Sequence, residues 1–134
     1  MRIFIDTSAF LSYLNAQDTH NAPAVETLAV LLKEDAELVC TNYILLETLS
    51  LLQRRFGMAA VQDFQQRFTP RLHVVWISAE QHDMAVNYLL QSNRRQLSLV
   101  DCSSFDTMRR LGIEKVFTFD EHFQEQGFQT IPQR

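Results

Sequence analysis

Short apolar runs alternate along this chain with longer segments of helical periodicity. The runs are rich in β-branched and aromatic residues and stop at polar ones, as expected of buried strands. They cover residues 2–5, 37–40, 72–77 and 115–119, with a further short strand near Thr130. The segments between them predict helices from about Ser8 and over residues 22–33, 42–56, 58–68, 79–91 and 99–111. Strands that alternate with helices are typical of an α/β fold with a mainly parallel central sheet.

Polar and glycine residues mark the ends of these helices. Ser78 and Ser98 each open a segment with capping-box spacing, and Gly57 and Gly112 end two others. In the segment over 22–33, a proline near the start and apolar residues at Val25, Leu28 and Leu32 predict a helix. A length of 134 residues favours one domain over residues 1–134.

Charge and cysteine content narrow the class of protein. Twelve basic and sixteen acidic residues leave a net charge of −4, which argues against holding nucleic acid by bulk positive charge. A nuclease stays possible, because a carboxylate metal site would itself add negative charge. Cys40 and Cys102 lie in a chain with no secretory signal and no apolar stretch long enough to span a membrane. We therefore expect a cytoplasmic protein with reduced, packed thiols.

Two aspartates follow predicted strands directly. Asp6 comes after the run over 2–5, and Asp120 comes after the run over 115–119. In parallel sheets ligands bind at the carboxyl ends of the strands, so this placement is a first indication of a functional site. The alternative is that these aspartates only start turns or cap helices.

Two more carboxylates lie on predicted apolar helix faces. Glu47 shares a stripe with Ile44 and Leu51, so it loses hydration and needs a partner, either an arginine or a metal ion. Asp101 leads the buried series through Phe105 and Met108. An ion-paired or extended glutamate and a purely structural capping box are the respective alternatives.

Together, Asp6, Glu47, Asp101 and Asp120 can converge at one edge of the sheet. Like charges at close range repel and raise one another's pKa values, and Mg²⁺ or Mn²⁺ relieves this repulsion. Such an ion suits the hydrolysis of a phosphodiester. Asp106 lies about 140° further round its helix than Asp101 and is not expected among the ligands.

Four motifs, in order, resemble those of the PIN-domain nucleases and, within them, the VapC-type toxins of bacterial and archaeal toxin–antitoxin pairs. They are IFIDTSAF at 3–10, TNYILLETLSLL at 41–52, LSLVDCSSFDTMRRLGI at 97–113 and VFTFDEHFQEQGF at 116–128. The resemblance makes Asp6, Glu47, Asp101 and Asp120 the four carboxylates that bind one or two Mg²⁺ or Mn²⁺ ions. The sequence differs from the family pattern at Asp106, where the resemblance implies a small apolar residue.

The resemblance also implies a three-layer α/β/α fold, endonucleolytic cleavage of RNA, a homodimer, and inhibition by a small antitoxin whose tail occupies the active site. The implied substrates are structured RNAs, such as tRNA or the ribosomal sarcin–ricin loop. VDCSSF and FDEHF resemble members that act on that loop.

Ten of the twelve basic residues are arginine, whose planar fork suits phosphate. Candidates for contacts with the RNA backbone are Arg94, Arg95, Arg109 and Arg110, although solvated helix faces carry arginines too.

Several residues near the motifs have two interpretations. Ser8 could bind a metal-associated water, but helix capping is favoured. His122 could support Asp120, but a surface position is favoured. Trp76 and most of the ten phenylalanines are expected in the core.

Two alternatives to a nuclease stay open. A receiver-like regulatory module also gathers aspartates at strand ends, but it needs an acidic pair after the first strand and a phosphoaccepting aspartate after a middle one. A PIN-like module that binds RNA without cutting it would normally lack a carboxylate.

Overall fold

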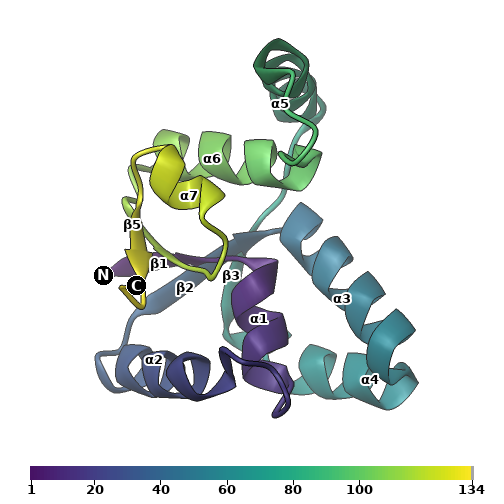
Figure 1. The fold of residues 1–134 in the computed structure, drawn as a ribbon, viewed down its shortest axis with the longest axis vertical. Coiled ribbons are helices and arrows are strands. Elements are labelled where there is room, and N and C mark those ends of the chain that lie inside the picture. Colours follow the sequence, from purple (N-terminus) through teal and green to yellow (C-terminus); the bar gives the residue numbers. More distant parts are fainter. Residues whose placement is uncertain (134) are drawn as a thin grey trace.

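The structure, a computed structural model, describes residues 1–133 and contains a five-stranded parallel sheet (Figure 1). The strands are β1 (Arg2–Ile5), β2 (Glu37–Thr41), β3 (Leu72–Val75), β4 (Lys115–Phe117) and β5 (Gln129–Ile131). Their order is β3-β2-β1-β4-β5, and all neighbours pair in parallel. The chain therefore builds outward from β1 on one side and returns to add β4 on the other. The carboxyl ends of β1 and β4 flank this switch point, where ligands bind in open parallel sheets.

Helices cover both faces of the sheet, which confirms the predicted three-layer α/β/α class. They are α1 (Thr7–Leu14), α2 (Asn21–Lys33), α3 (Asn42–Phe56), α4 (Met58–Arg67), the 3₁₀ helix η1 (Thr69–Arg71), α5 (Ala79–Ser92), α6 (Leu99–Leu111) and α7 (His122–Glu125). In Figure 1, α1, α2 and α4 lie on one side, and α6 and α7 on the other. Helix α5 packs on α6, while α3 contacts both α1 and α6 and so joins the two layers.

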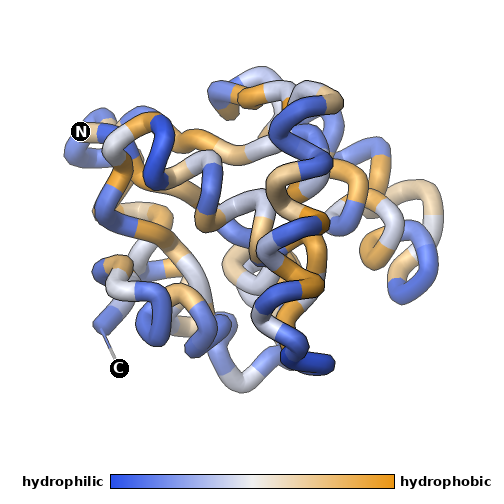
Figure 2. Tube along the Cα trace, turned by 90° about the horizontal axis from the view of Figure 1, so that it is seen from above, coloured by the Kyte–Doolittle hydropathy of each residue, from blue (hydrophilic) through white to orange (hydrophobic). Residues whose placement is uncertain are grey.

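The core lies between the sheet and these helix layers. The β1 residues Ile3, Phe4 and Ile5 are buried, as are Phe105 and Met108 on the inner face of α6. Figure 2 shows hydrophobic and hydrophilic positions alternating along the helices, as the periodicity predicts. Cys40 and Cys102 are both buried and free, which confirms packed thiols.

Phenylalanines join α4 to α1 beneath the sheet. The rings of Phe10 and Phe64 meet edge to face with centroids 5.0 Å apart, and Phe68 stacks on Phe64 at 5.4 Å. Aromatic pairs of this geometry stabilise a core beyond the area that they bury.

Helix α2 buries only part of its apolar positions, and the expectation that Trp76 lies in the core is wrong. Helix α2 buries Ala24, Leu28 and Leu31, and leaves Val25 and Leu32 exposed. Apolar residues flank Leu28 on both sides of the helix, so periodicity alone did not decide which side packs. Trp76 is 73% exposed, because the chain leaves the sheet at Val75, before the predicted end of the strand at residue 77.

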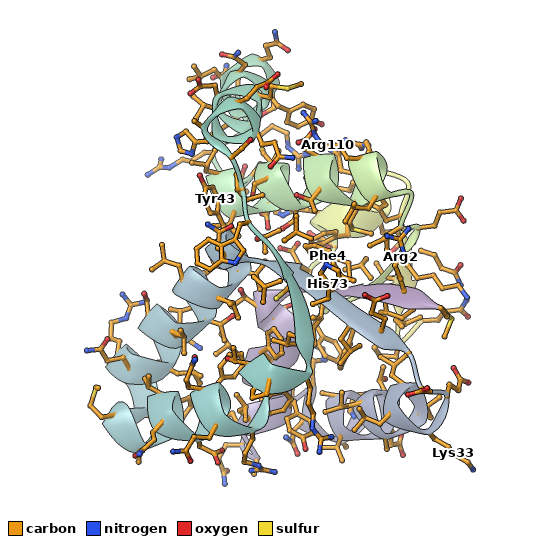
Figure 3. All side chains as sticks on the ribbon, turned by 180° about the vertical axis from the view of Figure 1, so that it is seen from behind. Arg2, Phe4, Lys33, Tyr43, His73 and Arg110 are labelled. Atoms are coloured by element: carbon orange, nitrogen blue, oxygen red, sulfur yellow. The ribbon has the colours of Figure 1, made fainter. Side chains whose placement is uncertain are left out.

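The turn after β3 has a physical cause. The backbone N–H of Ile77 donates to Asn42 Oδ1 at 2.7 Å, at the start of α3, instead of continuing the sheet. In Figure 3, Tyr43 marks this end of α3, and its hydroxyl group bonds to His82 of α5.

The strand β4 is also shorter than predicted, ending at Phe117 rather than residue 119. The N–H of Phe119 donates to Ser8 Oγ at 3.0 Å, so the chain turns toward the end of β1. Two short elements, η1 and α7, had no counterpart in the sequence prediction. Among the described residues, no helix is both long and apolar enough to cross a membrane.

Replacing Phe64 with alanine should lower the free energy of unfolding by about 3–5 kcal/mol, because it empties a buried aromatic site. Denaturant titration measures this loss. The matched control is Phe56→Ala at the exposed end of α3, which should change stability by less than about 1 kcal/mol. Equal losses in the two variants would contradict the assigned core.

Candidate metal centre

Asp6 lies at the end of β1 and caps α1, whose first residue is Thr7. Its side chain is 4% exposed. Oδ2 accepts hydrogen bonds from Ser8 Oγ at 2.8 Å and Thr118 Oγ1 at 3.0 Å, together with a longer one from Ser8 N at 3.4 Å. All these bonds reach the same oxygen of the Asp6 carboxylate.

Hydroxyl groups tie the end of β1 to the end of β4. Ser8 Oγ and Thr118 Oγ1 lie 3.1 Å apart, and the N–H of Asp120 donates to Thr118 Oγ1 at 2.9 Å. The chain segment that carries Asp120 is therefore positioned by the same network that holds Asp6. The favoured capping role of Ser8 is wrong, because the capping side chain is Asp6, and the Ser8 hydroxyl contacts Thr118, the residue after β4.

Asp101 enters the site from the first turn of α6. The predicted capping box is present: Asp101 N donates to Ser98 Oγ at 3.0 Å, and Ser98 N donates to Asp101 Oδ2 at 3.2 Å. The side chain of Asp101 is nevertheless nearly buried, as its place above Phe105 and Met108 predicts. Asp101 can therefore serve in the capping box and as a metal ligand at once, since the capping bonds fix the direction of its carboxylate.

Glu47 comes from α3, where Ile44, Thr48 and Leu52 form the buried face. Thr48 Oγ1 donates to Thr7 Oγ1 at 3.1 Å, which fixes this part of α3 against the start of α1. Glu47 is half-buried beside this contact.

The structure brings the four carboxylates within electrostatic range of one another. Burial raises the pKa of Asp6 from its ordinary value of 3.8 to about 6; bonds from Ser8 and Thr118 oppose this rise, and the charges of Asp101 and Asp120 add to it. Burial also raises the pKa of Glu47, with smaller contributions from Asp6 and Asp120. The pKa of Asp101 is raised by burial and by Asp120. The charges of Asp6, Asp101 and Asp120 thus act on one another at this sheet edge, and Glu47 lies within range of Asp6 and Asp120.

His122 also belongs to this cluster, although the sequence favoured a surface position. Its Nδ1 atom lies 3.0 Å from Asp120 Oδ1 and 3.7 Å from Asp101 Oδ2, and its side chain is 15% exposed. Among the described residues, this buried nitrogen has no hydrogen-bond partner of acceptable geometry. The only signal in the sequence was its position two residues after Asp120.

Residues 3–129, which include all these side chains, match the PIN domain family. The chain belongs to the PIN domain family. A curated relative, the 23S rRNA-specific endonuclease VapC20 of Mycobacterium tuberculosis, is 33% identical over 127 residues, which cover 94% of this chain and 95% of VapC20.

Solved structures agree with this PIN-domain assignment. The crystal structure of M. tuberculosis VapC20, a sarcin–ricin loop cleaving toxin, matches with a TM-score of 0.80, and the match covers 94% of this chain and 95% of that one. FitAcB from Neisseria gonorrhoeae matches at 0.69 with 16% identity, covering 97% of this chain and 96% of that one. VapBC2 from Rickettsia felis, bound to a promoter DNA fragment, matches at 0.71 with 15% identity and 97% coverage of both chains. The last two show the fold alone.

The side chains of this PIN domain fit a divalent cation. Asp101, Asp120 and His122 each offer a ligand atom, and these atoms all lie within 4.8 Å of one another. Carboxylate oxygens are the ligands that hard divalent cations prefer, and a cation would relieve the repulsion that raises the pKa values. Within residues 1–133, the buried Nδ1 atom of His122 has no hydrogen-bond partner, although Asp120 Oδ1 lies 3.0 Å away and Asp101 Oδ2 3.7 Å away.

The four candidate arginines lie on the α5–α6 side of the PIN domain, and three of them bind neighbouring groups. Arg94 Nη1 pairs with Glu125 Oε2 at 2.9 Å, and Arg110 Nε pairs with Asp106 Oδ2 at 2.7 Å. Arg109 donates to Gln126 and lies over the ring of Phe128. Arg95 is exposed in the loop before α6. Asp106 is thus occupied by a surface ion pair, consistent with its predicted place outside the carboxylate set.

The metal-free protein should become less stable as the pH rises from about 4 to about 6. The Asp6 carboxyl group holds its proton more tightly in the folded than in the unfolded chain, so the folded state binds more protons in this window. Asp6→Asn removes the buried charge and keeps a capping side chain. In EDTA it should raise the free energy of unfolding at pH 7.5 by about 1–3 kcal/mol and change it little at pH 4.

Denaturant titration at both pH values measures this effect. Asp63→Asn on α4 is the control, because Asp63 is an exposed carboxylate that pairs with Arg67 on the surface. It should preserve the pH dependence of the wild type. An Asp6→Asn variant that is less stable than the wild type at pH 7.5 would contradict the assigned electrostatics.

Proposed function

We propose that this protein is a metal-dependent endoribonuclease and the toxin of a toxin–antitoxin pair. Its substrate would be a structured RNA, with the sarcin–ricin loop of 23S rRNA favoured over tRNA. The observation that carries the proposal is the convergence of four carboxylates at the switch point of the sheet, in a chain 33% identical to a 23S rRNA-specific endonuclease along nearly its whole length. We assign one nuclease domain to residues 1–134 and place its action in the cytoplasm, where ribosomes lie.

The four carboxylates take different roles in this proposal. Asp6 and Asp101 hold the principal Mg²⁺ or Mn²⁺ ion, since both are buried and fixed by hydrogen bonds. Asp120 completes that site or holds a second ion. A cation bound there would polarise a phosphate oxygen and lower the pKa of an attacking water.

Glu47 orients the attacking water or coordinates directly. Its pKa is raised by burial, which brings the carboxylate closer to the range in which it can accept a proton during the reaction. Its place on α3 is fixed by the contact of Thr48 with Thr7, so it can approach the reacting phosphate without moving the helix.

The arginines would hold the RNA backbone. Arg94 is the best placed of the four, because its partner Glu125 ends α7, the helix that His122 begins. An exposed ion pair contributes little to stability, so Arg94 can exchange Glu125 for a phosphate group. Arg95, Arg109 and Arg110 extend the same basic side, with no role in reading bases.

A small antitoxin is the proposed protein partner. Trp76 and Leu46 are exposed apolar side chains on neighbouring segments, since Ile77 bonds to Asn42 at the start of α3. Exposed apolar side chains on neighbouring segments support a protein-binding surface. The homodimer stays a prediction.

Incubation of purified protein with 23S rRNA in ribosomes, in Mg²⁺ or Mn²⁺, should yield one discrete fragment end. Asp101→Asn should slow cleavage by at least about 100-fold, because it removes a charged ligand while the capping bonds can persist. Primer extension across the loop measures the product.

The control is Asp106→Asn, which lies on the same helix but forms only a surface ion pair. It should cleave at nearly the wild-type rate. Fragments that appear equally with wild type and Asp101→Asn would overturn the catalytic proposal.

Replacing Arg94 with alanine should weaken binding to the RNA loop by about 3–10-fold and reduce the salt dependence of the affinity by about one charge. Binding is measured by fluorescence anisotropy in the Asp101→Asn background, so that the RNA stays intact. Arg71→Ala is the matched control, because Arg71 ends η1 at the opposite, amino edge of the sheet. An equal loss of affinity in both variants would contradict the assigned RNA surface.

A further inference from the structure

We propose that His122 is a direct ligand of the ion at the carboxylate site and makes the site favour Mn²⁺ over Mg²⁺. This inference rests on the proposed function and adds a nitrogen donor to its four carboxylates. The Nδ1 atom of His122 is a nitrogen in a site whose other candidate ligands are carboxylate oxygens.

His122 differs from His73 and His82, whose Nδ1 atoms have partners. His73 Nδ1 lies 2.7 Å from Glu37 Oε1 on the surface, and His82 Nδ1 bonds to the hydroxyl group of Tyr43. Within residues 1–133, His122 Nδ1 is buried and has no hydrogen bond, despite two carboxylate oxygens nearby. Buried polar atoms are normally satisfied, so an unsatisfied one in a candidate metal site indicates an absent partner.

The distances also fit ligands of one shared ion, while in the described part of the chain the geometry around His122 Nδ1 does not make a hydrogen bond. Two ligands at about 2.1 Å from a cation and at right angles to each other lie about 3.0 Å apart. His122 Nδ1 and Asp120 Oδ1 are separated by 3.0 Å, and Asp101 Oδ2 lies 3.7 Å from the same nitrogen, as a wider ligand angle requires. All three ligand atoms fall within 4.8 Å of one another.

The ring is held in place by its neighbours. The backbone N–H of His122 donates to Asp120 Oδ1 at 2.8 Å, which fixes the two residues relative to each other. The next residue, Phe123, is fully buried, with its ring 5.0 Å from that of Phe105 and 6.5 Å from that of Phe4. The imidazole is therefore preorganised toward the carboxylates, as metal-binding side chains require.

A nitrogen ligand changes the choice of ion. Mg²⁺ prefers oxygen donors and keeps several waters, whereas binding of first-row transition ions gains more from an imidazole donor. A site of carboxylates alone would discriminate weakly between Mg²⁺ and Mn²⁺. With His122 as a ligand, the Mn²⁺ affinity rises more than the Mg²⁺ affinity does.

The test is metal binding by the RNA-free protein, with calorimetric titration of Mn²⁺ and Mg²⁺ and pulsed EPR of the Mn²⁺ form. The wild type should show the hyperfine coupling of a directly bound histidine nitrogen. His122→Gln should lose that coupling and lower the Mn²⁺ affinity by about 10-fold or more, while the Mg²⁺ affinity falls by less than about 3-fold. His73→Gln, an exposed histidine on β3, is the matched control and should behave as the wild type.

Absence of nitrogen coupling in the wild type would overturn the inference, and this measurement needs no variant to fold. An unchanged ratio of Mn²⁺ to Mg²⁺ affinity in His122→Gln would also overturn it. Asp101→Asn separates this failure from that of the proposed function. If the wild type binds both ions and Asp101→Asn binds neither, the carboxylate site stands and only the role of His122 fails. If the wild type binds no ion, both proposals fail.

Discussion

Burial of like charges at one edge of the sheet is the constraint on which this structure depends. Asp6 is almost completely buried, yet it lies within electrostatic range of three other carboxylates. Buried carboxylates this close together would take up protons or move apart if no other bonds held them. Here they are held by bonds that also build the fold: Asp6 caps α1, and Asp101 closes the capping box of α6. Local folding signals therefore bring together charges that would otherwise separate.

The remainder of the scaffold opposes this repulsion from both sides of the sheet. Asp6 caps α1 and Glu47 lies on α3, which packs on α1; α1 is in turn fixed to α4 through the Phe10 and Phe64 contact. Asp101 and Asp120 lie on the other side, next to α7 and its buried Phe123. Because the carboxylates come from both helix layers, the site is assembled only when both layers pack on the sheet. The aromatic core thus stabilises a site that destabilises the metal-free protein.

Sequence patterns predicted what depends on local order and missed what depends on distant partners. Asp6 and Asp120 were found because strand ends converge in a parallel sheet, and Asp101 because helix periodicity marks a buried face. His122 was misjudged, since a four-residue helix has no periodicity to show which side is buried. The bridging role of Ser8 depends on Thr118, 110 positions away. Trp76 is exposed because the strand ends early, where the N–H of Ile77 donates to Asn42. No local sequence pattern predicts that bond.

The distribution of charge links the site to its proposed polyanionic substrate. Setting aside Asp6, Glu47, Asp101 and Asp120 leaves twelve acidic residues against twelve basic ones, so the net charge of −4 is equivalent to the charge of the site itself. A phosphate group approaching four ionised carboxylates is repelled, and Arg94 and Arg110 are already paired with acidic neighbours. The attraction that these arginines offer to RNA is therefore partly offset by the charge of the bare site. Cations that neutralise the carboxylates would therefore strengthen RNA binding at the site, in addition to the catalytic role proposed for them.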